Sequence, residues 1–239
     1  MGDVIGRLHS VQSLGAVDGP GLRYVVFLQG CPMRCAYCHN PDTWDAAGGE
    51  PVTLEALMAQ IRRYRSYLLP HGGVTVSGGE PLAQPAFVAA LFRQLRAEGF
   101  HTALDTAGAG SAEAAAQVLP HTDLVICDLK FPDAARFRQY CRGELSRTLA
   151  FLDQTAAANV PVWLRQVIVP GLNDTADDVR ALCRMARRWP NVQKIELLPF
   201  RRLCLGKYAQ LGIPFPLADT PECPPETIAA LEKIIKNDS

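Results

Sequence analysis

The feature that most constrains the fold is a regular alternation of two kinds of segment along the chain. Short runs rich in apolar and β-branched residues are each followed by a segment whose apolar residues recur at helical spacing. The runs that we expect to form strands are residues 24–28, 74–77, 102–105, 124–128, 162–169 and 194–198. The segments that we expect to form helices are residues 54–61, 87–95, 111–119, 145–158, 177–188 and a last one that begins at Pro225.

Strands that alternate with helices form parallel sheets through right-handed crossovers, which predicts the α/β class. A chain of 239 residues with six βα units is too short to close an eight-stranded barrel. We therefore predict a partial parallel (β/α)6 barrel that is open on one side. No internal linker, repeat or low-complexity tract interrupts the pattern, so we expect a single domain, 1–239, with its core at about 16–236.

Composition excludes several classes of function. The 24 Lys and Arg residues balance the 24 Asp and Glu residues, so no net field would steer the protein to nucleic acid or to an anionic membrane. No apolar run approaches the roughly 18 residues that span a bilayer. The segment from Met1 to Ser10 lacks the apolar core of a signal peptide. We expect a soluble cytoplasmic protein.

Polar or glycine-rich residues follow nearly every expected strand. Because the carboxyl ends of parallel strands meet at one edge of the sheet, these residues are candidates for one site. Arg165 differs, since it lies inside an apolar strand, where its charge is costly unless a carboxylate pairs with it. The residues at the strand ends are Gly30 and Cys31, Gly78 to Glu80, Asp105 and Thr106, Asp128 and Lys130, and Pro199 to Arg202.

Three of the eight cysteines, Cys31, Cys35 and Cys38, follow the pattern C-x3-C-x2-C on one short segment. Structural zinc would need a fourth ligand, and the only near candidate, His39, directly follows Cys38 and would reach the same ion awkwardly. Buried, unligated thiols are a second alternative. A 4Fe–4S cluster fits better, because three thiolates leave one iron open for a non-protein ligand. The scattered cysteines, expected to be buried small hydrophobes, are Cys127, Cys141, Cys183, Cys204 and Cys223.

The cysteine pattern, with an aromatic residue before its last cysteine, resembles the signature of the radical S-adenosylmethionine superfamily. The wider chain, from about Val4 to past Lys207, is similar to the glycyl-radical-enzyme activases of that superfamily. The step from Trp44 to Leu54 leaves no room for the inserted ferredoxin-like domain of many activases, which favours the branch that acts on pyruvate formate-lyase. The segments that carry the resemblance are VDGPGLR (17–23), QGC (29–31), CHNPDTW (38–44), SGGE (77–80), LDT (104–106), DLK (128–130), VPG (169–171) and ELLP (196–199).

This resemblance implies a radical oxidoreductase that works in anaerobic glucose metabolism. In the family, the open iron binds S-adenosylmethionine, and one electron splits it into methionine and a 5′-deoxyadenosyl radical. The radical then removes hydrogen from a glycine Cα of the partner enzyme. The implied partners are pyruvate formate-lyase and, as electron donor, flavodoxin or ferredoxin; a monomer is expected, and no catalytic side chain beyond the cluster and S-adenosylmethionine is implied.

The resemblance also implies which residues surround the cofactor. Gly78 and Gly79 would meet the methionine amino group, and Lys130 its carboxylate. Arg201 stands where the family often has a cofactor-binding histidine, and Ala107 where asparagine is common. The implied contacts are Tyr37, Cys38, His39, Asn40, Gly78, Gly79, Glu80, Asp105, Asp128, Leu129, Lys130, Arg165 and Arg201. The implied ligands of a monovalent cation are Asp105, Thr106, Ile126 and Asp128.

Several alternatives stay open at the level of sequence. His39 could orient its loop through a hydrogen bond, and Asp105 could cap a helix. The partner could be a different glycyl radical enzyme. A radical enzyme acting on a small molecule usually carries additional domains or cysteines, which this chain lacks. An iron–sulfur electron-transfer module would close all four ligand positions with protein thiolates.

Overall fold

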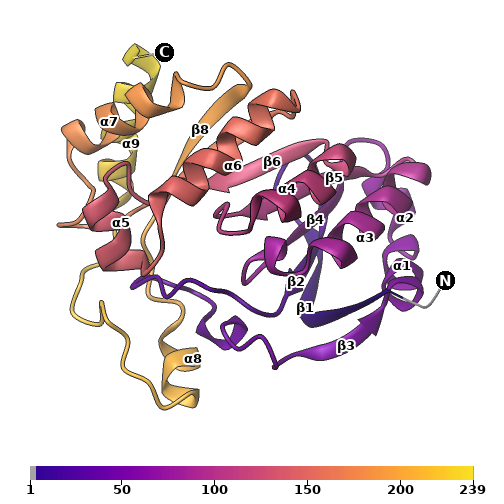
Figure 1. The fold of residues 1–239 in the computed structure, drawn as a ribbon. Helices are drawn as coiled ribbons and strands as arrows, with labels where there is room; N and C mark the ends of the chain where they lie inside the picture. The colour runs from indigo at the N-terminus through magenta and orange to yellow at the C-terminus, as the bar shows by residue number, and fades with distance from the viewer. Residues whose placement is uncertain (1–3, 239) are drawn as a thin grey trace.

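The computed structural model describes residues 4–238. All six predicted strands are present, and they run parallel to one another in chain order (Figure 1). This confirms the α/β prediction and the parallel arrangement. The six strands are β2 (Arg23–Leu28), β4 (Gly73–Gly78), β5 (His101–Thr106), β6 (Leu124–Asp128), β7 (Val162–Ile168) and β8 (Val192–Pro199).

Two further strands, which sequence analysis did not predict, extend the sheet at its β2 edge. β1 (Ile5–Gly15) pairs antiparallel with β2, and β3 (Glu50–Thr53) pairs antiparallel with β1. Most side chains of β1 are half-buried or exposed, so the strand lacks the apolar pattern by which a core strand is found. The strand order is β3-β1-β2-β4-β5-β6-β7-β8, and β3 and β8 form separate edges of an open sheet, as expected for a partial barrel.

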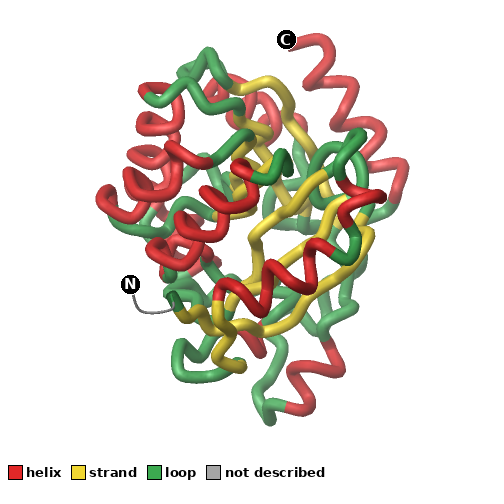
Figure 2. The backbone as a smooth tube through the Cα atoms, turned by 90° about the vertical axis from the view of Figure 1, so that its right-hand side faces the viewer, coloured by secondary structure: helices red, strands yellow, loops and turns green. Residues whose placement is uncertain are grey.

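Every predicted helix is present, and most of the apolar residues of its stripe are buried, except in the last helix, where only Leu231 is buried and the isoleucines of the stripe are half-buried. Figure 2 shows the strands as one curved layer with helices packed outside it. In Figure 1, α3, α4 and α6 follow one another across that outer side, and α3 packs on α4 and α4 on α6. These helices are α1 (Leu54–Arg62), α3 (Pro85–Ala97), α4 (Ala112–Val118), α6 (Leu145–Ala157), α7 (Ala176–Ala186) and α9 (Pro225–Asp238).

Three short helices were not predicted: α2 (Arg65–Leu68), α5 (Ala134–Cys141) and α8 (Leu205–Gln210). In α5, only Phe137 and Cys141 are buried, which is too few apolar residues for a helical stripe. A capping signal does exist, since the Asp133 carboxylate accepts from the Arg136 backbone N–H at 2.8 Å. Within the described residues, no helix is long and apolar enough to cross a membrane.

Candidate functional site

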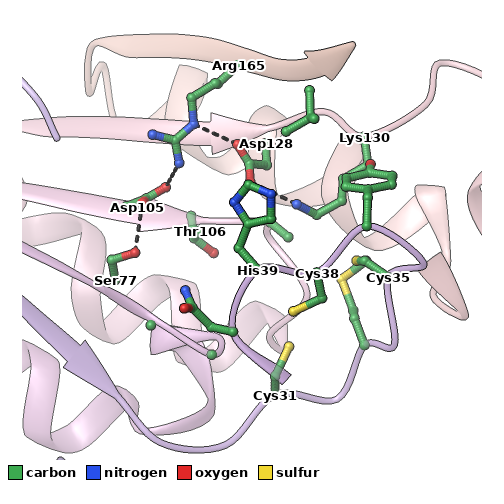
Figure 3. Close-up of a pocket in the computed structure, with 17 residues that line it drawn as sticks. Cys31, Cys35, Cys38, His39, Ser77, Asp105, Thr106, Asp128, Lys130 and Arg165 are labelled. Atoms are coloured by element: carbon green, nitrogen blue, oxygen red, sulfur yellow. Dashed lines mark hydrogen bonds and ion pairs between the residues drawn. The ribbon is translucent and has the colours of Figure 1, made fainter. Parts of the chain in front are cut away.

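A cavity of about 230 Å³ lies at the carboxyl ends of the parallel strands, where the sequence predicted the site. One wall is the loop after β2, which carries the three clustered cysteines, and charged residues of β5, β6 and β7 face it (Figure 3). The predicted residues that line the cavity are Cys31, Cys35, Tyr37, Cys38, His39, Asn40, Gly78, Gly79, Asp105, Thr106, Asp128, Lys130 and Arg165.

Backbone hydrogen bonds to two other segments fix the cysteine loop. The Gly30 N–H donates to the Thr43 carbonyl at 2.8 Å. On the other side, the Arg34 N–H donates to the Cys141 carbonyl at 2.9 Å, and the Ala36 N–H donates to the Tyr140 carbonyl at 2.7 Å. Helix α5, which the sequence did not predict, therefore holds in place the part of the loop between Cys31 and Cys38.

The three thiols on this loop suit an iron–sulfur cluster. Burial raises the pKa of the Cys31 thiol to about 12 and raises that of Cys38, so both sulfurs keep their protons until a metal displaces them. Within residues 4–238, no group of three or more His, Cys, Asp or Glu is compact enough to hold one metal ion. In a 4Fe–4S cluster each thiolate binds a different iron, so its donors need not meet at one point.

Gly78 and Gly79 let the end of β4 pack against the cysteine loop. Gly78 has a φ of +112°, a conformation that other residues rarely adopt. A Cβ on Gly79 would lie 2.3 Å from the Gly30 carbonyl oxygen, and the next residue, Glu80, donates its N–H to that same oxygen at 2.9 Å. Sequence analysis gave these glycines a ligand-binding reason, whereas the structure shows that close packing of two loops already requires them.

We expect Gly79→Ala to lower the free energy of unfolding by about 1–3 kcal/mol, because the Cβ would collide with backbone that cannot easily move. Urea denaturation of the iron-free chain measures this change. Gly206→Ala is the matched control, because nothing lies within 4 Å of a Cβ there. An equal change in both variants would contradict the packing argument.

A chain of charged side chains, each only 11–20% exposed, crosses the far wall of the cavity (Figure 3). Arg165 pairs with Asp105 and, at 2.8 Å, with Asp128, which also accepts from the Lys130 ammonium at 2.8 Å. Ser77 donates to Asp105 at 2.7 Å. The expectation that a carboxylate compensates the charge of Arg165 is confirmed, and two aspartates supply it.

The electrostatics of this wall follow from its pairing. Burial alone would raise the pKa of Asp128, but the charges of Arg165 and Lys130 hold it well below its usual value. Burial likewise opposes the charge of Lys130, and Asp128 overcomes it and raises the pKa of the ammonium. Asp128 and Lys130 therefore keep their opposite charges at neutral pH.

Four predicted residues do not line the cavity: Glu80, Leu129, Ile126 and Arg201. Glu80 is buried, and its carboxylate accepts from the Thr106 hydroxyl at 2.6 Å and from the Leu82 N–H at 3.0 Å, so its side chain ties loops together. Leu129 is fully buried in the core. The Ile126 side chain packs in a small apolar cluster, so only its main-chain carbonyl could bind a cation.

Arg201 also lies outside the residues that line the cavity, in contrast to its predicted contact with the cofactor. Its guanidinium donates to the Cys223 carbonyl at 3.1 Å and pairs with Glu222 at 3.4 Å. Its backbone carbonyl accepts from the His39 ring Nε2 at 2.8 Å. This bond is the loop-orienting role that remained open for His39.

Because the Arg201 side chain points to Glu222, Arg201→Ala should change the affinity for S-adenosylmethionine by less than about twofold, or about 0.4 kcal/mol. The carbonyl that His39 binds is kept in this variant. Anaerobic calorimetry of the cluster-loaded protein measures the affinity. A tenfold loss of affinity would instead support the cofactor contact that the sequence predicted.

Sequence analysis missed four residues that line the cavity: Met33, Ser77, Ala107 and Val167. Two of them carried a usable signal. Ser77 directly precedes the glycine pair at a strand end, and Val167 is two residues after Arg165, so both point to the same face of β7. Ala107 stood out only as a departure from the asparagine that is common in the family, and Met33 carried no signal of this kind.

Comparison with known proteins bears on the family. Residues 17–147, more than half of the chain, match the model of a 4Fe-4S single cluster domain. The pyruvate formate-lyase-activating enzyme of Clostridium pasteurianum is 43% identical over 98% of this chain and 98% of its own. The chain belongs to the pyruvate formate-lyase activating enzyme family.

A second curated relative supports this assignment, and a more distant solved structure shares the fold. The pyruvate formate-lyase 1-activating enzyme of Escherichia coli K12 is 42% identical over 98% of this chain and 96% of its own. Among solved structures, a radical SAM methyltransferase from Sphaerobacter thermophilus superimposes with a TM-score of 0.67 over 98% of this chain and 75% of its own. At 16% sequence identity, that likeness shows a shared fold only.

Proposed function

We propose that the protein activates pyruvate formate-lyase by generating its glycyl radical. The observation that carries the proposal is the cavity in which three cysteines face a wall of paired charges. Membership of the activating enzyme family supports it. When bound, a 4Fe–4S cluster supplies the electron that cleaves S-adenosylmethionine, and the 5′-deoxyadenosyl radical so formed takes hydrogen from a glycine Cα.

In this proposal Cys31, Cys35 and Cys38 hold the cluster and leave one iron for S-adenosylmethionine. Their convergence on one cavity supports the assignment, and so does the lack of any fourth thiol among the cavity residues. The loop donates backbone hydrogen bonds to carbonyls of α5 and of Thr43, which would hold its three thiols in place. A loop fixed in this way is ordered before the cluster binds.

The charged wall would bind the methionine end of the cofactor. Lys130 would offer its ammonium to the carboxylate, and Asp105 and Asp128 would help to place the cofactor from the same wall. The backbone of Gly78 and Gly79 completes this end, and Tyr37 to Asn40 contact the adenosine. Because Arg165 keeps both aspartates compensated, the wall is ordered before the cofactor arrives.

We also propose a monovalent cation beside the cofactor, held by the side chains of Asp105, Thr106 and Asp128 and by the main chain of Ile126. These oxygens suit a hard cation, and three of the four residues line the cavity. Activity measured in buffers that contain only potassium or only a bulky organic cation tests this part separately.

The remaining parts of the proposal concern the setting of the reaction. We propose that the chain acts as a monomer in the cytoplasm, in anaerobic glucose metabolism, and that flavodoxin or ferredoxin supplies the electron. We further propose a single domain over residues 1–239, with its core at about 16–236 and no inserted ferredoxin-like domain. The single continuous sheet supports this organisation.

The deciding experiment is anaerobic reconstitution with iron and sulfide, followed by reduction with dithionite in the presence of S-adenosylmethionine. Release of 5′-deoxyadenosine and methionine is the expected result. Added pyruvate formate-lyase should then acquire a glycyl radical, detected by electron paramagnetic resonance. A loaded cluster that never cleaves the cofactor would overturn the proposal, and cleavage with a radical only on another glycyl radical enzyme would reassign the partner.

A further inference from the structure

Cys141, the last residue of α5, is a thiol that the proposed reaction does not use. Its side chain is fully buried, and backbone hydrogen bonds join the end of α5 to the residues on either side of Cys35. Interaction between the two thiols raises the pKa of Cys35 and lowers that of Cys141. The Tyr37 hydroxyl lies 3.9 Å from the same sulfur.

The backbone keeps these two cysteines together. The residues on either side of Cys35 are both bonded to the end of α5, from Arg34 to the Cys141 carbonyl at 2.9 Å and from Ala36 to the Tyr140 carbonyl at 2.7 Å. Two bonds that flank one residue hold its side chain opposite the partner segment. The backbone carbonyl of Cys141 accepts one of these bonds, so the bond does not depend on the Cys141 side chain.

We propose that Cys141 is the resolving thiol for Cys35 when the protein has lost its cluster to oxygen. Hydrogen peroxide oxidises the freed Cys35 thiol to sulfenic acid and is reduced to water. The Cys141 thiol then attacks the Cys35 sulfur, a disulfide forms, and the sulfenic oxygen leaves as a second water. The inference rests on the proposed function only in that Cys35 is taken as a cluster ligand.

The consequence is a reversible resting state. A sulfenic acid with no thiol nearby is oxidised further to sulfinic acid, which cellular thiols do not reduce. A disulfide in a reducing compartment is temporary, so Cys35 returns to the thiol form and can accept iron again. The disulfide would also keep iron from the loop until reductant is available.

The test begins with iron-free protein, prepared anaerobically with a chelator and then treated with a small excess of hydrogen peroxide. Mass spectrometry of a non-reducing digest should find peptides that join Cys35 to Cys141. In Cys141→Ala, this crosslink is lost and Cys35 should carry two added oxygens, whereas Cys183→Ala, which removes another buried cysteine, should behave as the wild type.

A second readout is recovery. After treatment with dithiothreitol, followed by iron and sulfide, wild-type protein should regain its cluster absorbance, and Cys141→Ala should regain less. A crosslink from Cys35 to Cys31 or Cys38 in the wild type, or equal overoxidation of Cys35 in wild type and Cys141→Ala, would overturn the inference. Normal cofactor cleavage by unoxidised Cys141→Ala would show that the proposed function stands independently of this result.

Discussion

Replacing Cys31, Cys35 or Cys38 with alanine should lower cofactor cleavage by more than about 10²-fold. Removing a residue that hydrogen-bonds to a metal ligand already lowers metal affinity or activity about 10–100-fold, and removing a ligand lowers it more. All three thiols line one cavity, and no other residue that lines it is a cysteine that could replace a lost ligand. The measurement is 5′-deoxyadenosine released under anaerobic conditions, together with iron bound per chain.

The control for this prediction is Cys183→Ala. Cys183 is also buried, but it lies in α7, away from the residues that line the site. This variant should keep its iron and its activity. If Cys183→Ala lost the cluster as completely as Cys35→Ala, the assignment of ligands would be wrong.

The periodicity of the sequence was sufficient to predict the elements that are buried on both sides. The strand at 124–128 is a continuous apolar run, and it is β6 in the structure. β1 has a polar, half-exposed pattern, and its place at the edge follows from pairing with β2 rather than from its own composition. Such strands depend on tertiary pairing, which local sequence does not record.

The site was predictable where it depends on strand ends, and not where it depends on loops. Asp128 and Lys130 follow directly from the rule that the carboxyl ends of parallel strands share one edge. The orientation of Arg201 depends on Glu222, which lies 21 residues further along the chain. Glu80 was assigned to the ligand, but it accepts from neighbouring loops instead.

Arg165→Met should lower the free energy of unfolding by about 3–5 kcal/mol, because Asp105 loses its counter-charge and Asp128 keeps only Lys130. Only 11% of the Arg165 side chain is exposed, and it is the residue that joins Asp105 to Asp128. Methionine keeps much of the volume of the side chain, so the change isolates the charge. Urea denaturation of the iron-free chain at pH 7 gives the difference.

The dependence of this deficit on pH distinguishes lost charge from lost packing. In the wild type, Asp128 has a pKa below its ordinary value of 3.8, so its contribution to stability is present above that pH and is lost as the pH falls below it. In Arg165→Met, only Lys130 still opposes the effect of burial, so the pKa of Asp128 rises and acid protonates it more readily. The deficit should therefore shrink between pH 7 and about pH 4.

The control is Arg180→Met, which removes an exposed partner of Asp177 and should lower the free energy of unfolding by at most about 1 kcal/mol. A deficit at Arg165 that stays constant with pH would mean that packing, and not charge, holds this wall together.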